Sequence, residues 1–383
     1  MTPTLRAEFV SSLSEVCADD WDSLLGAQLF TQYHYLNALE QTGCVEPDSG
    51  WLPHHLLLYR GDALVAAMPL YIKLHSYGEY LFDWSWARAY EQHGLEYYPK
   101  LVSAIPYTAI TGPRLGIARD EDARQIQAAV AEALTQRSGQ LGGSGAQVLF
   151  MEPSALPHWT HDGWYQRRDL RYQWQHQGET DFDQFLARFK SRKRKMVRKE
   201  RSALSDKGIE TEVYEGRSIE PQLWQTFIRC YQTTYLKRSG HSGYLTPAFF
   251  NALASAFTDR IVMMVARHQQ QVLACALYLV DGDTLYGRYW GALVPVDGLH
   301  FELCYYQGIE YCLRRGLTCF DPGVQGEHKL ARGFEPTFSY GAGLIHHRGF
   351  APAIHRFCQQ EWEAIGMAEQ EARMALPFKQ TDD

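Results

Sequence analysis

The chain has 383 residues, of which 45% are hydrophobic and 13% are aromatic, and its formal net charge is -7. A chain of this length and composition is long enough for two domains with hydrophobic cores, which excludes a disordered protein. The acidic balance excludes general binding of polyanions, so any anion site must be local. The sequence shows neither a signal-peptide pattern nor a run of about 18 apolar residues, and we expect a cytoplasmic protein without membrane insertion.

The eight cysteines contain no Cys-x-x-Cys pair and lie mostly in apolar stretches. This distribution is typical of buried free thiols rather than of a zinc site. We therefore expect no bound metal.

The first half of the chain begins with helical spacing and continues as a hairpin. Apolar residues at helical spacing predict two short helices within residues 19–42. Residues 55–74 alternate as a β-hairpin, with Gly61-Asp62 as its turn. The elements expected later in this half are a strand over 107–111, an amphipathic helix over 121–137 and a strand over 148–153.

An aromatic insertion, residues 75–107, interrupts this half. Several aromatic side chains lie there among polar ones, and no clean period is present. We expect an irregular lid or groove wall in which Trp84, Glu91 and His93 bind an acceptor. A packed excursion without chemistry is the alternative.

The second half repeats the order of elements of the first. Leu64-Val-Ala-Ala matches Val272-Leu-Ala-Cys at an offset of 208 residues, and Glu152-Pro153 matches Asp321-Pro322 at an offset of 169. A matching order of elements is harder to obtain by chance than either short match, so we expect two copies of one α/β unit. The expected elements of this half are helices over 221–237 and near 247–258, a hairpin over 261–280, a strand over 284–290, a helix over about 301–315 and a strand over 317–320.

A polar, glycine-rich loop follows the last of these strands. In open α/β sheets, ligands bind beyond the carboxyl ends of strands, which makes this loop the main candidate site. A turn with a solvated charged face is the alternative. The charged and polar residues of the loop are Asp321, Glu327, His328, Lys329 and Arg332.

A basic segment precedes the second hairpin. Residues 188–201 contain nine Lys or Arg and one acid, Glu200, and the apolar spacing around them is helical. We expect a helix that packs on one face and binds a phosphate-bearing group through Lys193 and Lys195 on the other. A solvated charged face is the alternative.

Several separated motifs resemble a bacterial family of predicted N-acyltransferases labelled peptidoglycan biosynthesis or recognition. These motifs are Phe30-Thr-Gln-Tyr-His-Tyr, Phe82-Asp-Trp-Ser-Trp-Ala, Tyr97-Tyr-Pro-Lys-Leu, Thr111-Gly-Pro-Arg-Leu and Gln325-Gly-Glu-His-Lys-Leu-Ala-Arg-Gly-Phe. Two α/β units joined through a basic helix also resemble the Fem-type aminoacyltransferases of the GNAT superfamily. The resemblance implies an α/β fold of two tandem GNAT-like units, each a mixed, mostly antiparallel sheet flanked by helices. We place the first unit at 1–175, and the second, with the main site, at 176–383.

The resemblance also implies transfer of an acyl or aminoacyl group to a small-molecule or peptide amine. Such a reaction needs a base for the ammonium and donors for the oxyanion. We assign these roles to Glu327, His328 and Lys329. The side chains expected to bind substrates are Asp321, Arg332, Tyr289, Lys193, Lys195, Trp84, Glu91 and His93.

Three functions stay open: transfer from acyl-CoA, transfer from a charged tRNA, and binding without catalysis. An acyl-CoA donor usually meets a Gly-rich loop before the helix that follows the fourth strand; residues 291–300 lack that spacing, and Arg114-Leu-Gly116 fits it only partly. A charged tRNA donor would use the basic helix, although the Fem pattern expects Lys directly before Gly-Phe, where this chain has Arg332. The third is a non-catalytic protein that binds cell-wall glycopeptide.

Overall fold

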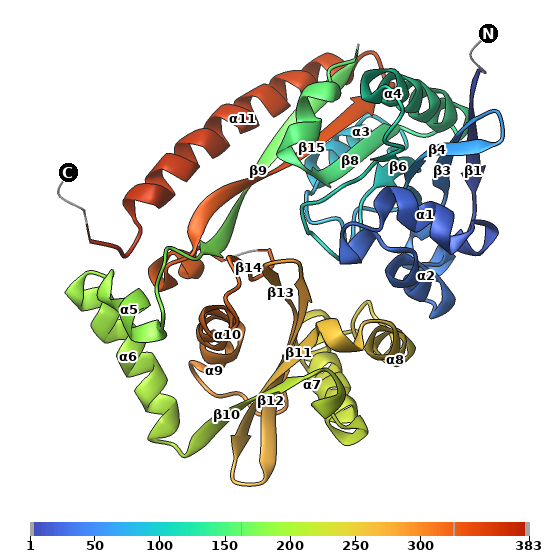
Figure 1. Cartoon of the computed structure of the whole chain (residues 1–383). Helices are drawn as coiled ribbons and strands as arrows, with labels where there is room; N and C mark the ends of the chain where they lie inside the picture. The colour runs from blue at the N-terminus through green and yellow to red at the C-terminus, as the bar shows by residue number, and fades with distance from the viewer. Residues whose placement is uncertain (1–3, 162, 325, 380–383) are drawn as a thin grey trace. The chain divides into compact units, whose positions relative to one another are not determined.

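The computed structural model describes residues 4–161, 163–324 and 326–379. The chain divides into two compact units (Figure 1). Unit 1 comprises Met1–Leu170 and Phe338–Met367, and unit 2 comprises Arg171–Thr337 and Ala368–Asp383. Residues 338–367, which the sequence analysis placed in the second unit, are thus part of unit 1.

Unit 1 contains a small antiparallel sheet with strand order β1-β3-β4-β7. Two short helices precede its hairpin, as predicted, and the turn of the hairpin is Gly61-Asp62. The elements are β1 (Leu5–Val10), α1 (Ala18–Leu25), α2 (Tyr33–Gln41), β3 (His55–Arg60), β4 (Ala63–Met68) and β7 (Gly116–Ile117).

The other sheet strands of unit 1 run in the order β15-β8-β6-β5-β2. Helix α4 (Ala123–Gln140) buries Ile126, Val130 and Leu134 in the core that these strands share with the small sheet. Asp122 caps this helix by accepting hydrogen bonds from two backbone amides of its first turn. The strands are β2 (Trp51–Pro53), β5 (Tyr71–Lys73), β6 (Lys100–Ser103), β8 (Gly145–Met151) and β15 (Glu335–Ile345).

Unit 2 is built on a mixed sheet with strand order β10-β11-β12-β13-β14-β9. Its strand pairs are antiparallel except for β13 and β14, which are parallel. Helix α7 (Pro221–Ser239) packs so closely on β13 that a Cβ atom at Gly291 would lie 2.1 Å from the backbone of Cys230. The strands are β9 (Trp164–Gln175, of which 171–175 belong to unit 2), β10 (Ile209–Glu215), β11 (Ile261–His268), β12 (Gln271–Asp281), β13 (Thr284–Ala292) and β14 (Cys319–Asp321).

The helices of unit 2 lie between these strands along the chain. The predicted helices over 221–237, 247–258 and 301–315 are all present. The last of them starts irregularly, because a π-helical turn separates its first residues from the rest. The helices are α5 (Phe182–Ala187), α6 (Ser191–Ser205), α7 (Pro221–Ser239), α8 (Pro247–Ala256), α9 (Leu299–Phe301), the π-helical turn η7 (Glu302–Tyr306) and α10 (Gln307–Arg315).

The two hairpins are equivalent residue by residue, which confirms the internal match at an offset of 208. In unit 1 the pairing shifts between Leu58 and Tyr59, so that Val65 bulges. In unit 2 the shift falls between Ala266 and Arg267, and Leu273 bulges. Both turns place a residue at positive φ, Gly61 at 62° and Gln269 at 55°. A β-bulge at the same position in both hairpins is a specific feature that chance similarity does not explain.

The acidic-proline match at an offset of 169 is wrong. The parallel pairings place Gln147 opposite Val102 in unit 1, and Asp321 opposite Tyr286 in unit 2. Val102 and Tyr286 are equivalent because they pair with Tyr71 and Leu279, which are 208 residues apart. Gln147 is therefore the equivalent of Asp321, at an offset of 174. Glu152 lies farther along because β8 has seven residues whereas β14 has three.

The aromatic insertion is shorter and more regular than predicted. Strand β5 ends at Lys73 and β6 begins at Lys100, so the excursion covers 74–99 and includes the helix α3 (Trp84–Gln92). Residues 107–111 do not form the expected strand. Ile105 and Gly112 make only isolated bridges, and the segment packs as a buried loop.

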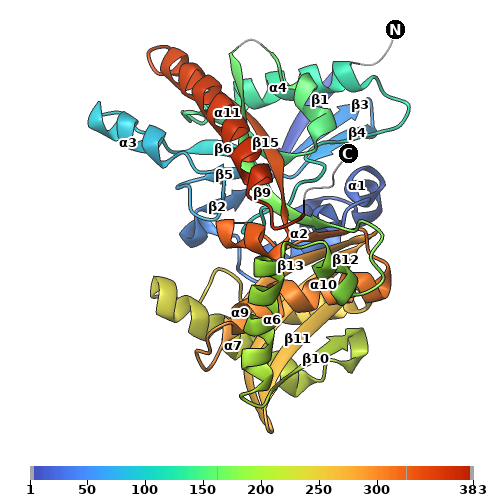
Figure 2. The same ribbon diagram turned by 90° about the vertical axis from the view of Figure 1, so that its left-hand side faces the viewer.

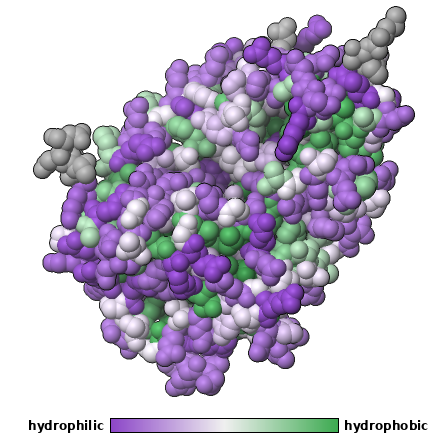
Figure 3. Space-filling view, in the orientation of Figure 1, coloured by the Kyte–Doolittle hydropathy of each residue, from purple (hydrophilic) through white to green (hydrophobic). Residues whose placement is uncertain are grey.

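Strands β9 and β15 and the long helix α11 (Ala351–Met374) have no counterpart in the predicted elements. In both views α11 runs alongside β9 and β15 (Figures 1 and 2). Hydrophilic residues cover most of the face seen in Figure 3. None of the helices in the described part of the chain combines the length and the apolarity that a bilayer crossing requires.

Candidate active site in unit 2

The predicted site loop starts where β13 and β14 separate. Their parallel ladder ends at the pair Tyr286 and Asp321. Beyond this pair β13 continues to Ala292, whereas the segment that follows β14 turns away at Pro322. The loop then forms a short 3-10 helix, η8 (Glu327–Arg332). This position, beyond the carboxyl end of a strand next to a splayed neighbour, is where α/β sheets commonly bind ligands.

Asp321 is buried at the base of this opening. Its Oδ1 atom accepts a hydrogen bond from the Gly323 amide at 2.8 Å, and its Oδ2 atom accepts one from Gln173 at 3.2 Å. The Arg171 guanidinium lies 3.5 Å from both carboxylate oxygens. A buried carboxylate needs such partners, because an unpaired charge in the interior is strongly destabilising.

Lys329 lies in the same buried cluster. Its ammonium donates a hydrogen bond to the Gly323 carbonyl oxygen at 2.6 Å, and only 1% of the residue is exposed. Burial lowers the pKa of Lys329 to about 8, although the nearby Asp321 carboxylate acts in the opposite direction. A lysine of this kind can donate hydrogen bonds at pH 7 and also exchange a proton near that pH.

His328 and Tyr305 form a polar pair at the edge of the opening. The Nε2 atom of His328 lies 2.8 Å from the Tyr305 hydroxyl oxygen. Partial burial, together with the charges of Arg332 and Lys329, lowers the pKa of His328, so the imidazole is neutral at pH 7. Burial raises the pKa of the Tyr305 phenol, which therefore keeps its proton.

Tyr305 belongs to the π-helical turn η7, which lies between α9 and α10. Such turns insert an extra residue into a helix and occur frequently at functional sites. A second histidine, His300, lies with its ring centre 6.3 Å from that of His328. Burial and the neighbouring His328 lower the pKa of His300 to about 4, so it too is neutral at pH 7.

Arg332 is occupied in holding the loop. Its guanidinium donates to the His328 carbonyl oxygen at 2.8 Å and to the Glu200 carboxylate at 2.7 Å, and it lies 3.5 Å above the centre of the Phe301 ring. Glu200 also accepts a hydrogen bond from the Tyr306 hydroxyl. These contacts fix η8 against α6 and the π-helical turn, whereas the buried Nε atom of Arg332 has no hydrogen-bond partner among the described residues.

The structure thus brings Asp321, His328, Lys329 and Arg332 into one region of unit 2. Glu327 is exposed, and the described residues offer it no hydrogen-bonded or ionic partner. Tyr289 packs in an aromatic cluster, with its ring centre 6.0 Å from that of Tyr231 and 5.5 Å from that of Phe250. The residues of this site that the sequence analysis did not identify are Tyr305, Arg171, Gln173 and Glu200.

The three predicted acceptor residues of the insertion lie on or next to α3 of unit 1. Trp84 contacts Tyr77 and Phe82, at ring-centre distances of 4.8 Å and 5.8 Å. Glu91 is exposed, and the exposed His93 ring donates a hydrogen bond to the Ala89 carbonyl oxygen at 2.8 Å.

A buried network ties this excursion to the sheet of unit 1. Lys100, which is 1% exposed, donates to Glu79 at 2.8 Å and to Asp83 at 2.5 Å. Tyr97 and Gln147 also donate to Asp83, at 2.6 Å and 2.8 Å. Burial alone would raise the pKa of Asp83, but the Lys100 charge and these hydrogen bonds lower it to about 2. The arrangement fits the alternative that we stated for the insertion, a packed excursion.

Unit 1 fills the space that corresponds to the opening of unit 2. The Gly112 amide donates to the Phe150 carbonyl oxygen at 3.0 Å, and the buried Arg114 donates to the Leu149 carbonyl oxygen at 2.8 Å. The chain itself therefore extends the pairing along β8. Phe150 adopts a positive φ of 57° at this point, a conformation that costs energy in a residue other than glycine.

The basic segment forms α6, which begins at Ser191 rather than at Arg188. Val197 and Leu204 are buried, whereas Lys195 is exposed and Lys193 is half-buried. Acids from other elements neutralise part of its charge. Arg198 pairs with Asp183 at 2.9 Å, and Arg201 pairs with Glu302 and Glu310 at 2.8 Å and 2.7 Å.

The places expected for a coenzyme A pyrophosphate do not fit that group. Gly291 is required for the approach of α7, and Leu293 already donates its amide to the Leu273 carbonyl oxygen at 2.8 Å. In unit 1, Arg114 is buried against backbone carbonyls. Across the described ranges, no three His, Cys, Asp or Glu side chains come together as a metal site.

The folds of several solved structures are similar to this one. The crystal structure of FemX aligns with a TM-score of 0.52 at 11% identity, over 89% of this chain and 98% of that chain. The C-terminal domain of a putative lysylphosphatidylglycerol synthetase from Agrobacterium fabrum gives a TM-score of 0.50 at 12% identity, over 90% and 95% of the two chains. A tandem GNAT protein from the clavulanic acid biosynthesis pathway gives 0.47 at 12% identity, over 89% and 98%.

The topology of the two units defines a mixed α/β protein. The sequence matches the model of the FemAB-like family, described as peptidoglycan biosynthesis/recognition, over residues 12–380. The chain belongs to this family. No curated protein matches the sequence.

Proposed function

We propose that the protein transfers an acyl or aminoacyl group to an amine, and that the reaction takes place at the opening between β13 and β14 of unit 2. The observation that carries the proposal is the neutral His328, hydrogen-bonded to Tyr305 next to the buried Lys329. Membership of the FemAB-like family supports it. The residues of unit 1 that the structure describes form no equivalent opening, which favours one transfer site in the chain.

His328 is the base in this proposal. An amine acceptor is an ammonium ion at neutral pH and must lose a proton before it can attack a carbonyl carbon. The neutral imidazole accepts that proton, and the Tyr305 hydroxyl holds the ring in place. The exposed position of His328 allows the acceptor to reach it.

Lys329 stabilises the negative charge that develops on the carbonyl oxygen. Attack by the amine nitrogen forms the C–N bond and places a charge on this oxygen, after which the bond to the leaving group breaks and the leaving group takes up a proton. A buried ammonium interacts with that charge more strongly than an exposed one, because little water screens it. Asp321 and Arg171 fix the loop residue Gly323, to which Lys329 is hydrogen-bonded.

The donor in this proposal is an activated acyl or aminoacyl ester or thioester with phosphate groups. The basic residues of α6, in particular Lys193 and Lys195, would bind the phosphates. Because the pyrophosphate loop of a coenzyme A site is not present at residues 291–300, we favour a donor held along α6. A charged tRNA is a donor that α6 could hold in this way. The basic surface is small, so it would contact only a small part of the tRNA.

The first experiment is native mass spectrometry of the purified protein, followed by transfer assays. Acyl-CoA, aminoacyl-tRNA and muropeptide would be identified as co-purifying species and then offered as substrates. Product formation that His328→Ala abolishes supports the proposal. Tight binding of a glycopeptide without turnover of any donor would instead support the non-catalytic alternative.

A further inference from the structure

Strand β10 is the edge strand of the unit 2 sheet (Figure 1). All seven of its residues pair with β11, from Ile209 opposite His268 to Glu215 opposite Val262. In an antiparallel strand, every second residue directs its N–H and C=O groups away from that neighbour. No strand of the described chain pairs with the other side of β10, which therefore presents a row of backbone donors and acceptors without a strand partner.

A cleft of about 570 Å³ borders the same strand. Its volume is within the range of ligand sites, about 300–1,000 Å³. Ile209 and Thr211 of β10 form one wall, and residues of α5, α6, the π-helical turn and α10 form the others. The cleft belongs entirely to unit 2 and contains none of the residues of the transfer site.

Carboxylates outnumber cations in this cleft. Arg201 is shared by two of them, Glu302 at 2.8 Å and Glu310 at 2.7 Å. Because one guanidinium faces two carboxylates, the cleft keeps an excess of negative charge and attracts cations. The charged residues of the lining are Asp181, Asp183, Glu302, Glu310, Arg198 and Arg201.

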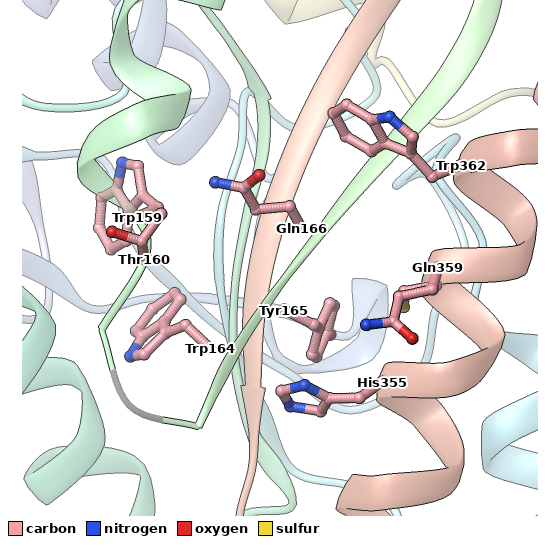
Figure 4. A pocket seen from close by; sticks show the side chains of 9 residues that line it. Trp159, Thr160, Trp164, Tyr165, Gln166, His355, Gln359 and Trp362 are labelled. Atoms are coloured by element: carbon pink, nitrogen blue, oxygen red, sulfur yellow. The ribbon is translucent and has the colours of Figure 1, made fainter. Parts of the chain in front are cut away.

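The cleft of unit 1 that Figure 4 shows has a different lining. Neither acids nor Lys or Arg line it in the described part of the chain. Its Trp159 and Trp164 are 2% and 7% exposed and belong to the core of unit 1, so they offer little surface to a ligand. Selection by charge is therefore a property of the cleft beside β10.

The opposite face of β10 is acidic as well. Side chains alternate along a strand, so Glu210 and Glu212 point away from the face that Thr211 occupies. Glu212 accepts hydrogen bonds from Arg267 at 2.7 Å and from Tyr214 at 2.6 Å. Glu210 is exposed. A strand added beside β10 would bring one of its side chains to about 4.5–5.5 Å from that of Glu210.

We propose that β10 binds an extended basic peptide as an additional strand of the unit 2 sheet. The peptide backbone pairs with the unpaired edge of β10. Its lysine or arginine side chains meet Glu210 on one face and the carboxylates of the cleft on the other.

A second copy of this chain fits the edge less well than a basic peptide does. The antiparallel register that pairs all of β10 with another β10 places Glu212 opposite Glu212. Like charges directly opposite each other destabilise a strand pair. The proposal does not depend on the transfer reaction.

The test uses the full chain and a fluorescein-labelled heptapeptide in which lysine and threonine alternate. We expect it to bind at low salt with a Kd on the order of 100 μM, measured by fluorescence anisotropy. Hydrogen exchange should show new protection at every second amide of β10, which charge attraction alone would not produce. A peptide with proline in place of each threonine keeps the charge but loses N–H groups, and it should not bind.

Glu210→Lys should weaken binding of the lysine–threonine peptide by roughly tenfold, because it places a like charge beside the added strand. Glu363→Lys is the matched control. It changes the net charge by the same amount at an exposed position of α11 in unit 1 and should bind as the wild type does. Thermal unfolding of both variants checks that they are folded.

Three results would overturn the proposal. The first is no binding of the lysine–threonine peptide at about 1 mM, or equal binding of the proline peptide. The second is binding without new protection of β10, since the peptide would then lie on another acidic surface. The third is a dimer whose β10 amides are already protected without peptide, because a second copy would then occupy the edge. His328→Ala should leave peptide binding unchanged, which separates this proposal from the proposed function.

Discussion

The Nε2 atom of His328 lies 2.8 Å from the hydroxyl oxygen of Tyr305, on a turn of π-helix that only the three-dimensional structure reveals. The pair joins the predicted loop to the π-helical turn that precedes α10. In the proposed reaction His328 is the base, and the contact with Tyr305 fixes the orientation of its ring, an arrangement common to many sites of proton transfer. The first two predictions concern this loop.

We expect His328→Ala to lower kcat/KM by roughly 10²-fold or more, because the acceptor ammonium would lose its base. The pKa of His328 is lowered by burial and by nearby cations, so the wild-type rate should hold below the usual histidine pKa of about 6.5 and fall at more acidic pH. Tyr305→Phe should shift this acidic limb without abolishing activity. The measurement is the pH profile of kcat/KM.

The matched control for this loop is Glu327→Gln. Glu327 precedes His328 but is exposed, and the described residues include no partner for it. We expect near wild-type turnover in this variant. A loss as large as that of His328→Ala would mean that Glu327 is the base, one of the two assignments made from the sequence.

Lys329→Met should lower kcat while stabilising the fold at neutral pH. The pKa of Lys329 in the folded protein is about 8, below the ordinary value of 10.5, so the unfolded chain binds more protons between these two pH values. The free energy of unfolding of the wild type should therefore rise, relative to that of the variant, from about pH 8 to pH 10.5, by at most about 3 kcal/mol. Denaturant titrations at pH 7, 9 and 10.5 measure this difference. A constant difference across that range would contradict the prediction.

Local patterns in the sequence predicted most of the helices and strands. The hairpins and the helices before them follow from alternation and from turn residues that act over a few positions, whereas the bulges at Val65 and Leu273 were not predicted. Strand β9, which contains Arg167, Arg168 and Arg171, was not predicted. Each arginine has a partner that is distant in the sequence; Arg167, for example, pairs with Glu361, 194 residues away. Local sequence patterns do not show which distant residues pair.

The site was predictable in part for the same reason. The composition of the loop pointed to His328 and Lys329, because glycines and polar residues after a strand are a local feature. Tyr305, Arg171 and Gln173 approach the loop only through tertiary packing, so no spacing in the sequence connects them. His300 and Glu302 lie at the start of the helix but do not cap it, since Gly298 is the N-cap and Glu302 pairs with Arg201.

The buried network of unit 1 predicts a large stability effect. Lys100→Met would leave Asp83 and Glu79 without their cationic partner in the interior, and breaking such a pair costs about 3–5 kcal/mol. We expect a clear fall in the unfolding temperature, and we expect residues 74–99 to become disordered. Arg88→Met, a change of the same type on the exposed part of α3, should leave the unfolding temperature almost unchanged. Equal stabilities of the two variants would show that Lys100 contributes no net stabilisation.

The double variant Lys193→Ala, Lys195→Ala tests whether α6 binds a phosphate-bearing donor. Exposed charges are screened beyond about 10 Å at 0.1 M salt, so binding that depends on these lysines should weaken with salt, and the variant should bind more weakly with a flatter salt dependence. Its thermal stability should hold or rise, because like charges repel along the helix. The matched control is Arg217→Ala, Lys237→Ala, which removes the same charge from exposed positions outside α6. If both double variants bind the donor equally well at every salt concentration, α6 is a solvated face and the donor is held elsewhere.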